Sequence, residues 1–514
     1  MSMTAIPRPR TAPPSRLRRS LTVELRALTR AAPRLLPDGF AAAPDLRRLL
    51  LGEDVSCWTI GGLGLVGFGR AASFAVRGED RFTGARAWWD ELLGGMGIED
   101  PLARSATGPV AFGAFAFARA SASASGLVVP ELVIGHDATG AWATLVSHDE
   151  AQLTVEDVAE AWRRLVPQPL PPGPFTEQDG PGAQALEDPR AQERWCESVA
   201  AGIEEIRTGP LQKLVLARAV PVVACPADHG HSAPGDRGPE GRGPEDGAPE
   251  RAPGDPDPVA ALDIPRALRR LARDYDRCWS YCVTVREDED PGGGFRGDPA
   301  AGRLFGATPE RLVRVLDGVV HARVLAGTLE RTSSGPATED ERAWAREQLL
   351  ENAKQRTEHE FAITSLLQGI AAYTDSVRSS SEPFLLELPN VWHLASDVAC
   401  ELRRGPDGSV PSALELVEAV HPTAAVCGTP TATAAEAIAR LEDLDRGLYA
   451  GPVGWVDSRH NGDFGIALRG GVQVDAASAR VHAGCGVVAG SVPADELAET
   501  HAKLRPVLAA LGAS

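Results

Sequence analysis

The chain has 514 residues, 43% of them hydrophobic, and a formal charge of −18. This length allows a large buried core, in one big domain or in two to three smaller ones. No run of about 18 apolar residues is present, which excludes a membrane-spanning helix, and the acidic excess argues against a nucleic-acid partner or an anionic membrane surface. The eight cysteines form no CxxC pair, so we expect reduced thiols and a cytoplasmic location.

Lysine is unusually rare in this chain. Lysine and arginine together number 52, but only Lys213, Lys354 and Lys503 are lysines. A lysine is a compact charge that can lose its proton in a protein, whereas arginine stays protonated. Where a lysine is retained among so many arginines, an amine is specifically needed or the residue has survived by chance, and composition alone leaves both open.

The first half of the chain predicts mixed strands and helices. Residues 1–45 indicate a frayed start followed by one helix, and residues 46–170 form the N-terminal part of the fold. Glycine-broken apolar runs predict strands at 58–68, 109–118, 127–134 and 141–146, and a helix lies near 84–95. After a Pro- and Gly-rich connection at 168–190, we expect a helix at 190–207 and a strand at 211–223. Residues 225–258 contain too few apolar side chains to offset ordering entropy, which predicts a disordered insertion.

The second half, after another Gly-rich loop at 287–302, is more regular. A strand at 303–305 precedes a hairpin of 312–316 and 319–325, because Asp317-Gly318 is a strong two-residue turn signal. A long helix is predicted at 337–372, a strand at 391–402 and helices near 411–419 and 432–441. Two strands flank Asn461-Gly462, a third ends near Val488, and a last helix spans 493–511. Antiparallel strands among long helices indicate an α+β fold.

Two familiar motifs are incomplete. Gly62–Gly67 fits GxGxxG, but the dinucleotide fingerprint requires a helix directly after the last glycine, and here a strand-like pattern continues. A dinucleotide-binding oxidoreductase therefore remains only as an alternative. His359-Glu360 begins like HExxH, but Ile363 occupies the second histidine position. Cys427 is better explained as a small buried thiol than as a nucleophile.

The final helix carries a candidate metal site. Offsets of three and four residues place Glu496, Glu499 and Lys503 on one helix face. This face is either solvated, with an i,i+4 ion pair, or it presents a carboxylate pair to a metal ion. Glu358 in the long helix has the same two interpretations. Mg²⁺ takes one or two protein carboxylates and leaves room for substrate oxygens and water.

Lys213 and Glu310 are candidates for a base and an acid. Lys213 lies in an aliphatic strand, so it is either a surface lysine or one that faces a pocket, where a neutral amine could serve as a base. Glu310 lies in a turn between two strands. In an apolar pocket its pKa would rise, and it could then donate a proton. Together the two residues would suit a displacement on a small molecule.

Ten short motifs in order resemble the chorismate-utilising enzymes, most closely the isochorismate synthases of menaquinone or siderophore biosynthesis. They are KLVLAR at 213–218, FGATPE at 305–310, LAGT at 325–328, EH at 358–359, WHL at 392–394, HPTAAVCG at 421–428, YAGPVGW at 449–455, ALR at 467–469, AGCGV at 483–487 and ELAETHAK at 496–503. The resemblance covers residues 190–511, and it implies one α+β chorismate-binding fold with two antiparallel-rich sheets, helices around them and an interior active site.

The resemblance also implies roles for particular residues. Mg²⁺ would be held chiefly by Glu358 and Glu499, assisted by Glu496, and would bridge to a carboxylate of chorismate. Lys213 would activate water for attack at C2, and Glu310 would protonate the departing C4 hydroxyl. The other implied positions contact or line the substrate: Gly327, Thr328, His393, Ala425, Tyr449, Arg469, Gly484, Gly486 and Lys503. The chain would act as a monomer or weak homo-oligomer, with a small molecule as its partner.

Within this family the motifs favour the branch that uses water. Ammonia-using anthranilate synthases do not need a lysine base at 213, and aminodeoxychorismate synthases typically carry a lysine where this chain has Ala326. Salicylate synthases share Lys213, Glu310 and the metal glutamates, then eliminate pyruvate from isochorismate, and they remain the main alternative. A catalytically silent binding protein is another, because the loops at 225–258 and 287–302 depart from the family.

Overall fold

The computed structural model describes residues 17–52, 54–167, 182–225, 260–286, 301–331, 337–379, 382–389, 391–406 and 408–513. Residues 1–16 of the expected frayed start lie outside the described residues. So do nearly all of the predicted insertion at 225–258 and of the Gly-rich loop at 287–302.

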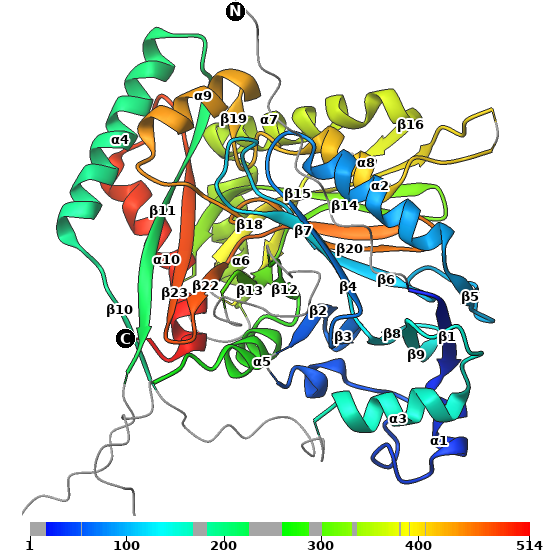
Figure 1. Ribbon diagram of the computed structural model, residues 1–514. Helices are drawn as coiled ribbons and strands as arrows, with labels where there is room; N and C mark the ends of the chain where they lie inside the picture. The colour runs from blue at the N-terminus through cyan, green and yellow to red at the C-terminus, as the bar shows by residue number, and fades with distance from the viewer. Residues whose placement is uncertain are drawn as a thin grey trace, which may run out of the picture.

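One of two large sheets has long upright strands at the left of the molecule and continues across its lower part to the right (Figure 1). It is 13-stranded in the described chain, and its pairs are antiparallel apart from β1 with β5. Its order is β10 (Ala183–Ala185), β11 (Lys213–Ala224), β23 (Ser478–Val487), β22 (Gly470–Asp475), β13 (Arg303–Thr308), β12 (Trp279–Thr284), β2 (Val55–Ile60), β3 (Leu63–Phe68), β8 (Leu132–Asp137), β9 (Gly140–Ser147), β1 (Arg19–Glu24) and β5 (Gly97–Glu99), with β19 (Gly428–Thr429) also paired to β11.

The second sheet is antiparallel and 10-stranded among the described residues. Its order is β16 (Thr374–Ser379), β18 (Val391–Leu402), β15 (Val319–Glu330), β14 (Arg311–Leu316), β21 (Gly462–Ile466), β20 (Pro452–Asp457), β6 (Val110–Ala114), β7 (Ser125–Val129) and β4 (Ala72–Val76), with β17 (Phe384–Glu387) paired to β18.

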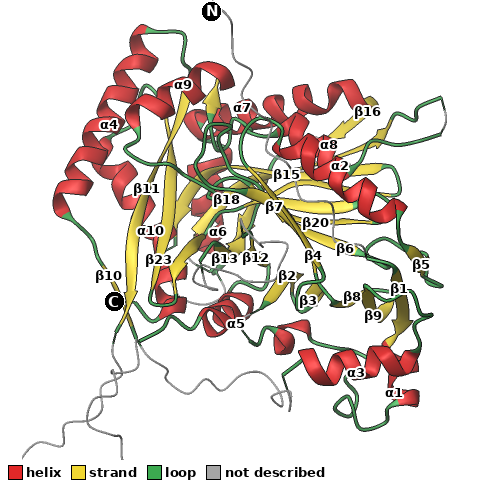
Figure 2. Cartoon of the chain, in the orientation of Figure 1, coloured by secondary structure: helices red, strands yellow, loops and turns green. Residues whose placement is uncertain are grey.

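Helices cover the outer faces and ends of both sheets (Figure 2). The end of the first sheet at β11 and β23 packs against α4 (Pro189–Thr208), α9 (Thr431–Leu441) and α10 (Pro493–Leu511), and α5 (Ile264–Asp274) packs on α10. Its other end packs against α1 (Leu25–Ala31) and α3 (Val155–Leu165). The second sheet carries α2 (Arg81–Gly94), α7 (Ala353–Ile370) and α8 (Ala413–Val420), while α6 (Glu339–Ala345) leads through a π-helical turn, Arg346–Leu350, towards α7.

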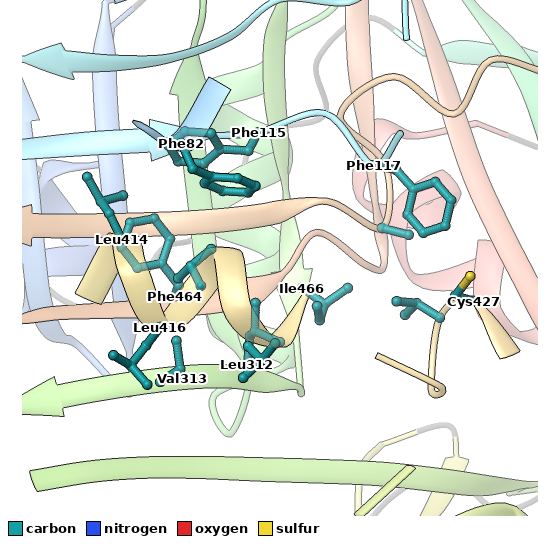
Figure 3. Close-up of a cluster of buried hydrophobic side chains, with 14 of the residues drawn as sticks. Phe82, Phe115, Phe117, Leu312, Val313, Leu414, Leu416, Cys427, Phe464 and Ile466 are labelled. Carbon is teal, nitrogen blue, oxygen red and sulfur yellow. The ribbon is translucent and has the colours of Figure 1, made fainter. Parts of the chain in front are cut away.

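Aromatic side chains fill the core on both sides of the second sheet. Between the two sheets, Trp58 and Trp279 stack with ring centroids 6.2 Å apart. On the outer face, Phe82 of α2 stacks on Phe115 at 4.6 Å, and Leu414 of α8 belongs to the same cluster (Figure 3). Buried aromatic pairs contribute both apolar area and preferred geometry, so they fix how sheets and helices sit against each other.

The α+β fold with two sheets is confirmed, and so is the hairpin about Asp317-Gly318, in which Leu316 pairs with Val319. The dinucleotide interpretation is wrong, because Gly62–Gly67 lies at the turn and in the second strand of the β2–β3 hairpin and no helix follows it. Among the described helices, none has both the length and the apolar character that a membrane crossing needs.

Four element predictions need correction. The apolar run 58–68 is not one strand, because it contains the end of β2 and the whole of β3, which pair as a hairpin. The expected frayed start contains strand β1, which pairs with β9. The apolar run 127–134 is two strands, β7 and β8, that belong to different sheets and are separated by Pro130, which has no N–H to continue a ladder. The single long helix predicted at 337–372 is interrupted, since α6 and α7 are separated by the π-helical turn and two further residues.

Candidate active site

The site forms where the chain crosses between the two sheets. Glu310 lies on the link from β13 in the first sheet to β14 in the second, and Arg469 lies on the return link from β21 to β22. The two crossings are hydrogen-bonded together, because Ile466 N–H donates to the Glu310 carbonyl at 3.2 Å and Ala307 N–H donates to the Arg469 carbonyl at 3.1 Å. An acid and a cation are therefore held at neighbouring positions between the sheets.

A cavity opens beside these crossings, with about 890 Å³ of space free of protein atoms, part of it open to solvent. Both sheets, α7, α10 and four connecting segments contribute to its wall. Its lining comprises Lys213, Val215, Ala217, Pro309, Glu310, Leu325, Gly327, Gln355, His393, Ala425, Val426, Arg446, Tyr449, Ala450, Leu468, Arg469, Gly484, Cys485, Gly486, Glu496, Glu499 and Lys503. All the site residues expected from the sequence lie on this wall except Thr328 and Glu358, whose side chains lie outside the described residues.

Lys213 reaches the cavity because of strand periodicity. It begins β11, and the alternate residues Lys213, Val215 and Ala217 all line the cavity. Lys213 is only 2% exposed. The interpretation of Lys213 as a surface lysine is therefore wrong, and its amine faces the cavity that Glu310 also lines.

Glu310 is a buried carboxyl whose proton is held unusually tightly. Burial raises the pKa of Glu310 to about 8, although the positive charges of Lys213, Lys503 and Arg469 pull that pKa down. Desolvation disfavours the charged form of a carboxyl, and here it outweighs three neighbouring cations. Glu310 is therefore protonated at neutral pH and can donate a proton into the cavity.

Arg469 and His393 form a hydrogen-bonded pair in the cavity wall. The Arg469 guanidinium donates to His393 Nε2 at 3.0 Å, and His393 Nδ1 lies 3.2 Å from the Gly327 carbonyl. Arginine has no acceptor, so Nε2 must accept and Nδ1 must carry the proton. Burial, with the charges of Arg469 and Lys503, holds the pKa of His393 well below its usual range. The imidazole is thus neutral and orients the Arg469 guanidinium.

The last helix turns its charged face towards the cavity. Glu496, Glu499 and Lys503 of α10 all line it, and Glu496 is 5% exposed. Lys503 Nζ donates to the Gly484 carbonyl at 2.9 Å and lies 2.5 Å from a Glu499 carboxylate oxygen. The i,i+4 ion pair expected for a solvated face is present between Glu499 and Lys503, and both side chains are half-buried. The face nevertheless lines the cavity, and Glu496 is buried there.

This donor set fits a hard divalent cation. Glu496 and Glu499 offer carboxylate oxygens to the cavity, and Mg²⁺ needs only one or two protein carboxylates when substrate and water oxygens complete its shell. Burial raises the pKa of the neighbouring Cys485 thiol, and the charges of Glu496 and Glu499 add to this rise while that of Lys503 opposes it. Among the described side chains, no group of three or more His, Cys, Asp and Glu residues is close enough to hold a metal alone. Glu358 lies on α7, with its side chain outside the described residues.

The wall also contains residues that the sequence did not single out. Gln355 of α7 lines the cavity, and its buried Oε1 has no hydrogen-bond partner among the described residues. Tyr449, which the sequence did single out, stacks on His482, with ring centroids 5.0 Å apart. Arg446 is buried beside the cavity in an ion pair with Glu442 at 2.5 Å. No local sequence signal marks these contacts, although Arg446 and Glu442 have the i,i+4 spacing of a helical ion pair.

Comparison with known proteins identifies the family. The sequence model of the chorismate binding enzymes matches residues 59–227 and 263–512, most of the chain. The chain belongs to the chorismate binding enzyme family. The family prediction made from the ten motifs is confirmed.

Several relatives of this chorismate binding enzyme are named isochorismate synthases, and an anthranilate synthase component 1 of Aquifex aeolicus is 36% identical over 211 residues. It is 28% identical over 464 residues to isochorismate synthase MenF of Bacillus subtilis, covering 88% of this chain and 86% of the relative. It is 29% identical over 466 residues to the salicylate biosynthesis isochorismate synthase of Pseudomonas aeruginosa, covering 89% and 84%. The menaquinone-specific isochorismate synthase MenF of Escherichia coli has the same fold, with a TM-score of 0.64, 21% identity and coverage of 97% and 96%.

Proposed function

We propose that this chain is an isochorismate synthase, which converts chorismate to isochorismate by adding water at C2 and releasing the C4 hydroxyl. One observation carries the proposal: a buried lysine and a buried, protonated glutamic acid line one cavity together with three further cationic side chains, two of which, Arg469 and Lys503, are free of the Glu442 ion pair. Relatives named isochorismate synthases, aligned over more than four fifths of both chains, support it. The ammonia-using alternative gives no reason for a lysine base at Lys213.

Arg469 and Lys503 would bind the substrate carboxylates. Chorismate is a dianion, and a protein with a net charge of −18 must offset that charge locally. Both cations line the cavity, and a guanidinium can grip a carboxylate through two parallel hydrogen bonds. His393 occupies part of the Arg469 donor set, so it restricts the directions in which the remaining N–H groups point. Binding would therefore fix the orientation of the ring as well as neutralise it.

Lys213 and Glu310 would carry the proton transfers. For this role the Lys213 amine would have to be unprotonated, and it would take a proton from water as the water oxygen attacks C2. The ring double bonds would shift, and Glu310 would give its proton to the C4 hydroxyl, which leaves as water. Each proton transfer contributes roughly 10²–10⁴ in rate. The raised pKa of Glu310 supports its role, because only a protonated carboxyl can act as the acid at neutral pH.

Glu496, Glu499 and, as the resemblance implies, Glu358 would hold Mg²⁺. When bound, Mg²⁺ would supply positive charge to a substrate carboxylate, in the manner of a Lewis acid. The two described carboxylates lie on the same helix face as Lys503, so one element would align the metal ligands and a substrate-binding cation.

Turnover assays test the proposal directly. The purified chain is incubated with chorismate and MgCl₂, with and without EDTA, and the products are identified by chromatography and mass spectrometry. Isochorismate is expected, and chelation should abolish its formation. Salicylate and pyruvate as the main products would support the salicylate synthase alternative, and no consumption of chorismate would leave a catalytically silent binding protein.

A further inference from the structure

One edge of β11 lacks a partner strand along much of its length. The strand pairs with β23 on one side from Leu214 to Val223. On its other side, β19 pairs only with Lys213 and Leu214, and β10 pairs only with Val222–Ala224. Among the described strands, none covers residues 215–221 on this side. Buried backbone groups there still need hydrogen-bond partners.

Side chains take the place of the missing strand. Arg446 donates one hydrogen bond to the Val215 carbonyl at 2.8 Å, and the Glu442 carboxylate accepts one from Ala217 N–H at 2.7 Å. Trp195 Nε1 donates to the Ala217 carbonyl at 3.1 Å. Arg446 and Glu442 side chains are each only 2% exposed and lie 2.5 Å apart, so each ion satisfies the other.

Arg446 of the same ion pair also binds the cavity wall at Ala425–Val426. Arg446 donates a second bond to the Val426 carbonyl at 2.8 Å, and Val215 N–H donates to the Cys427 carbonyl at 2.9 Å. Phe117 lies against the guanidinium, 4.3 Å from its carbon to the ring centroid. One guanidinium thus joins the strand that begins at Lys213 to the turn that contains Ala425.

We propose that Arg446 and Glu442 are positioning residues that fix Lys213 relative to the wall at Ala425–Val426, and so set the alignment of the amine with the reacting carbon. This inference rests on the proposed function, in which Lys213 activates water. The pair does not bind substrate through its charge, because the charge of Arg446 is already offset by Glu442. Loss of the pair should therefore reduce kcat and leave the affinity for chorismate largely unchanged.

The test uses Glu442→Gln, Arg446→Gln and the double variant, in which no buried ion is left without a counter-ion. Misplacement of a catalytic group by about 1 Å can cost roughly 10²-fold, so kcat of the double variant should fall by that order while KM stays within about threefold. Amide hydrogen exchange should become faster at Val215 and Ala217, and this readout does not depend on the reaction.

Arg459→Gln is the matched control. Arg459 also pairs with a buried carboxylate, Asp100 at 2.7 Å, and donates to a backbone carbonyl, Arg104 at 2.8 Å, but it lies outside the cavity lining. The Arg459→Gln variant should have a lower melting temperature, while its kcat and its amide hydrogen exchange in β11 stay unchanged. Wild-type kcat and wild-type exchange in the double variant would overturn the inference, as would an equal loss of kcat in the control. A wild-type chain that does not turn over chorismate would refute the proposed function instead, and exchange at Val215 and Ala217 would still decide whether the ion pair holds the strand.

Discussion

Replacing Glu310 with glutamine tests whether the carboxyl proton of this residue is needed for catalysis. Glutamine fills nearly the same volume but has no proton to give to the leaving hydroxyl. Loss of a general acid costs roughly 10²–10⁴ in kcat. The substrate-binding cations Arg469 and Lys503 stay in place, so KM should change far less than kcat.

The pH dependence of kcat/KM gives a second test of Glu310 as the acid. The pKa of Glu310 is raised by burial to about 8, so the wild-type kcat/KM should fall as the pH rises through that value and the acid loses its proton. Steady-state rates of chorismate consumption between pH 6 and 9.5, at saturating Mg²⁺, measure this limb. A wild-type profile that stays flat to pH 9, or a Glu310→Gln variant with more than a tenth of wild-type kcat, would refute the role of Glu310 as the acid.

Stability should respond to pH in the same range. Because folding raises the pKa of Glu310 above its ordinary 4.5 to about 8, the native state binds this proton more tightly than the unfolded chain. The stability from this group is complete below pH 4.5 and is lost as the pH rises to 8, with a slope of about 1.4 kcal/mol per pH unit. Urea unfolding at several pH values should show that the free energy of unfolding of Glu310→Gln rises relative to that of the wild type between pH 4.5 and 8. A constant difference would mean that Glu310 is already ionised in the folded protein.

Three further substitutions test the other assignments. Lys213→Arg keeps a cation but cannot supply a neutral amine, so kcat should fall roughly 10²–10⁴-fold with a smaller change in KM; near wild-type kcat would make Lys213 an electrostatic residue. Lys503→Arg should raise KM more than it lowers kcat, because that position supplies a positive charge for binding. A larger effect on kcat than on KM would mean that Lys503 takes part in the reaction itself. Glu499→Gln should abolish turnover at low Mg²⁺ with an unchanged circular dichroism spectrum, and full activity there would remove Glu499 from the metal site.

The sequence predicted those elements that are determined by residues within a few positions of each other. The hairpin about Asp317-Gly318 follows from its turn residues, and the common face of Glu496, Glu499 and Lys503 follows from helical spacing. The run 127–134 was predicted as one strand because β7 and β8 have the same apolar character. Their assignment to different sheets depends on partners outside the run, which are β6 for β7 and β3 for β8.

The site was only partly predictable, because its residues come together from segments that are far apart in the sequence. The motifs supplied its residue types, but Glu310 and Arg469 come together only because their two crossings between the sheets lie side by side. The buried state of Lys213 depends on cover from segments more than 200 residues away. The link from Arg446 to Val215 is equally distant in sequence, and no periodicity within either segment indicates it.

The most direct test of the central claim is to follow oxygen from solvent into product. The chain is given chorismate and Mg²⁺ in ¹⁸O-labelled water, and the product is examined by NMR and mass spectrometry at early conversion. The account predicts isochorismate with one solvent oxygen, on C2, and release of the original C4 oxygen as water. Isochorismate without solvent oxygen would show that the hydroxyl migrates within the substrate, and it would contradict the assignment of Lys213 as the base for water.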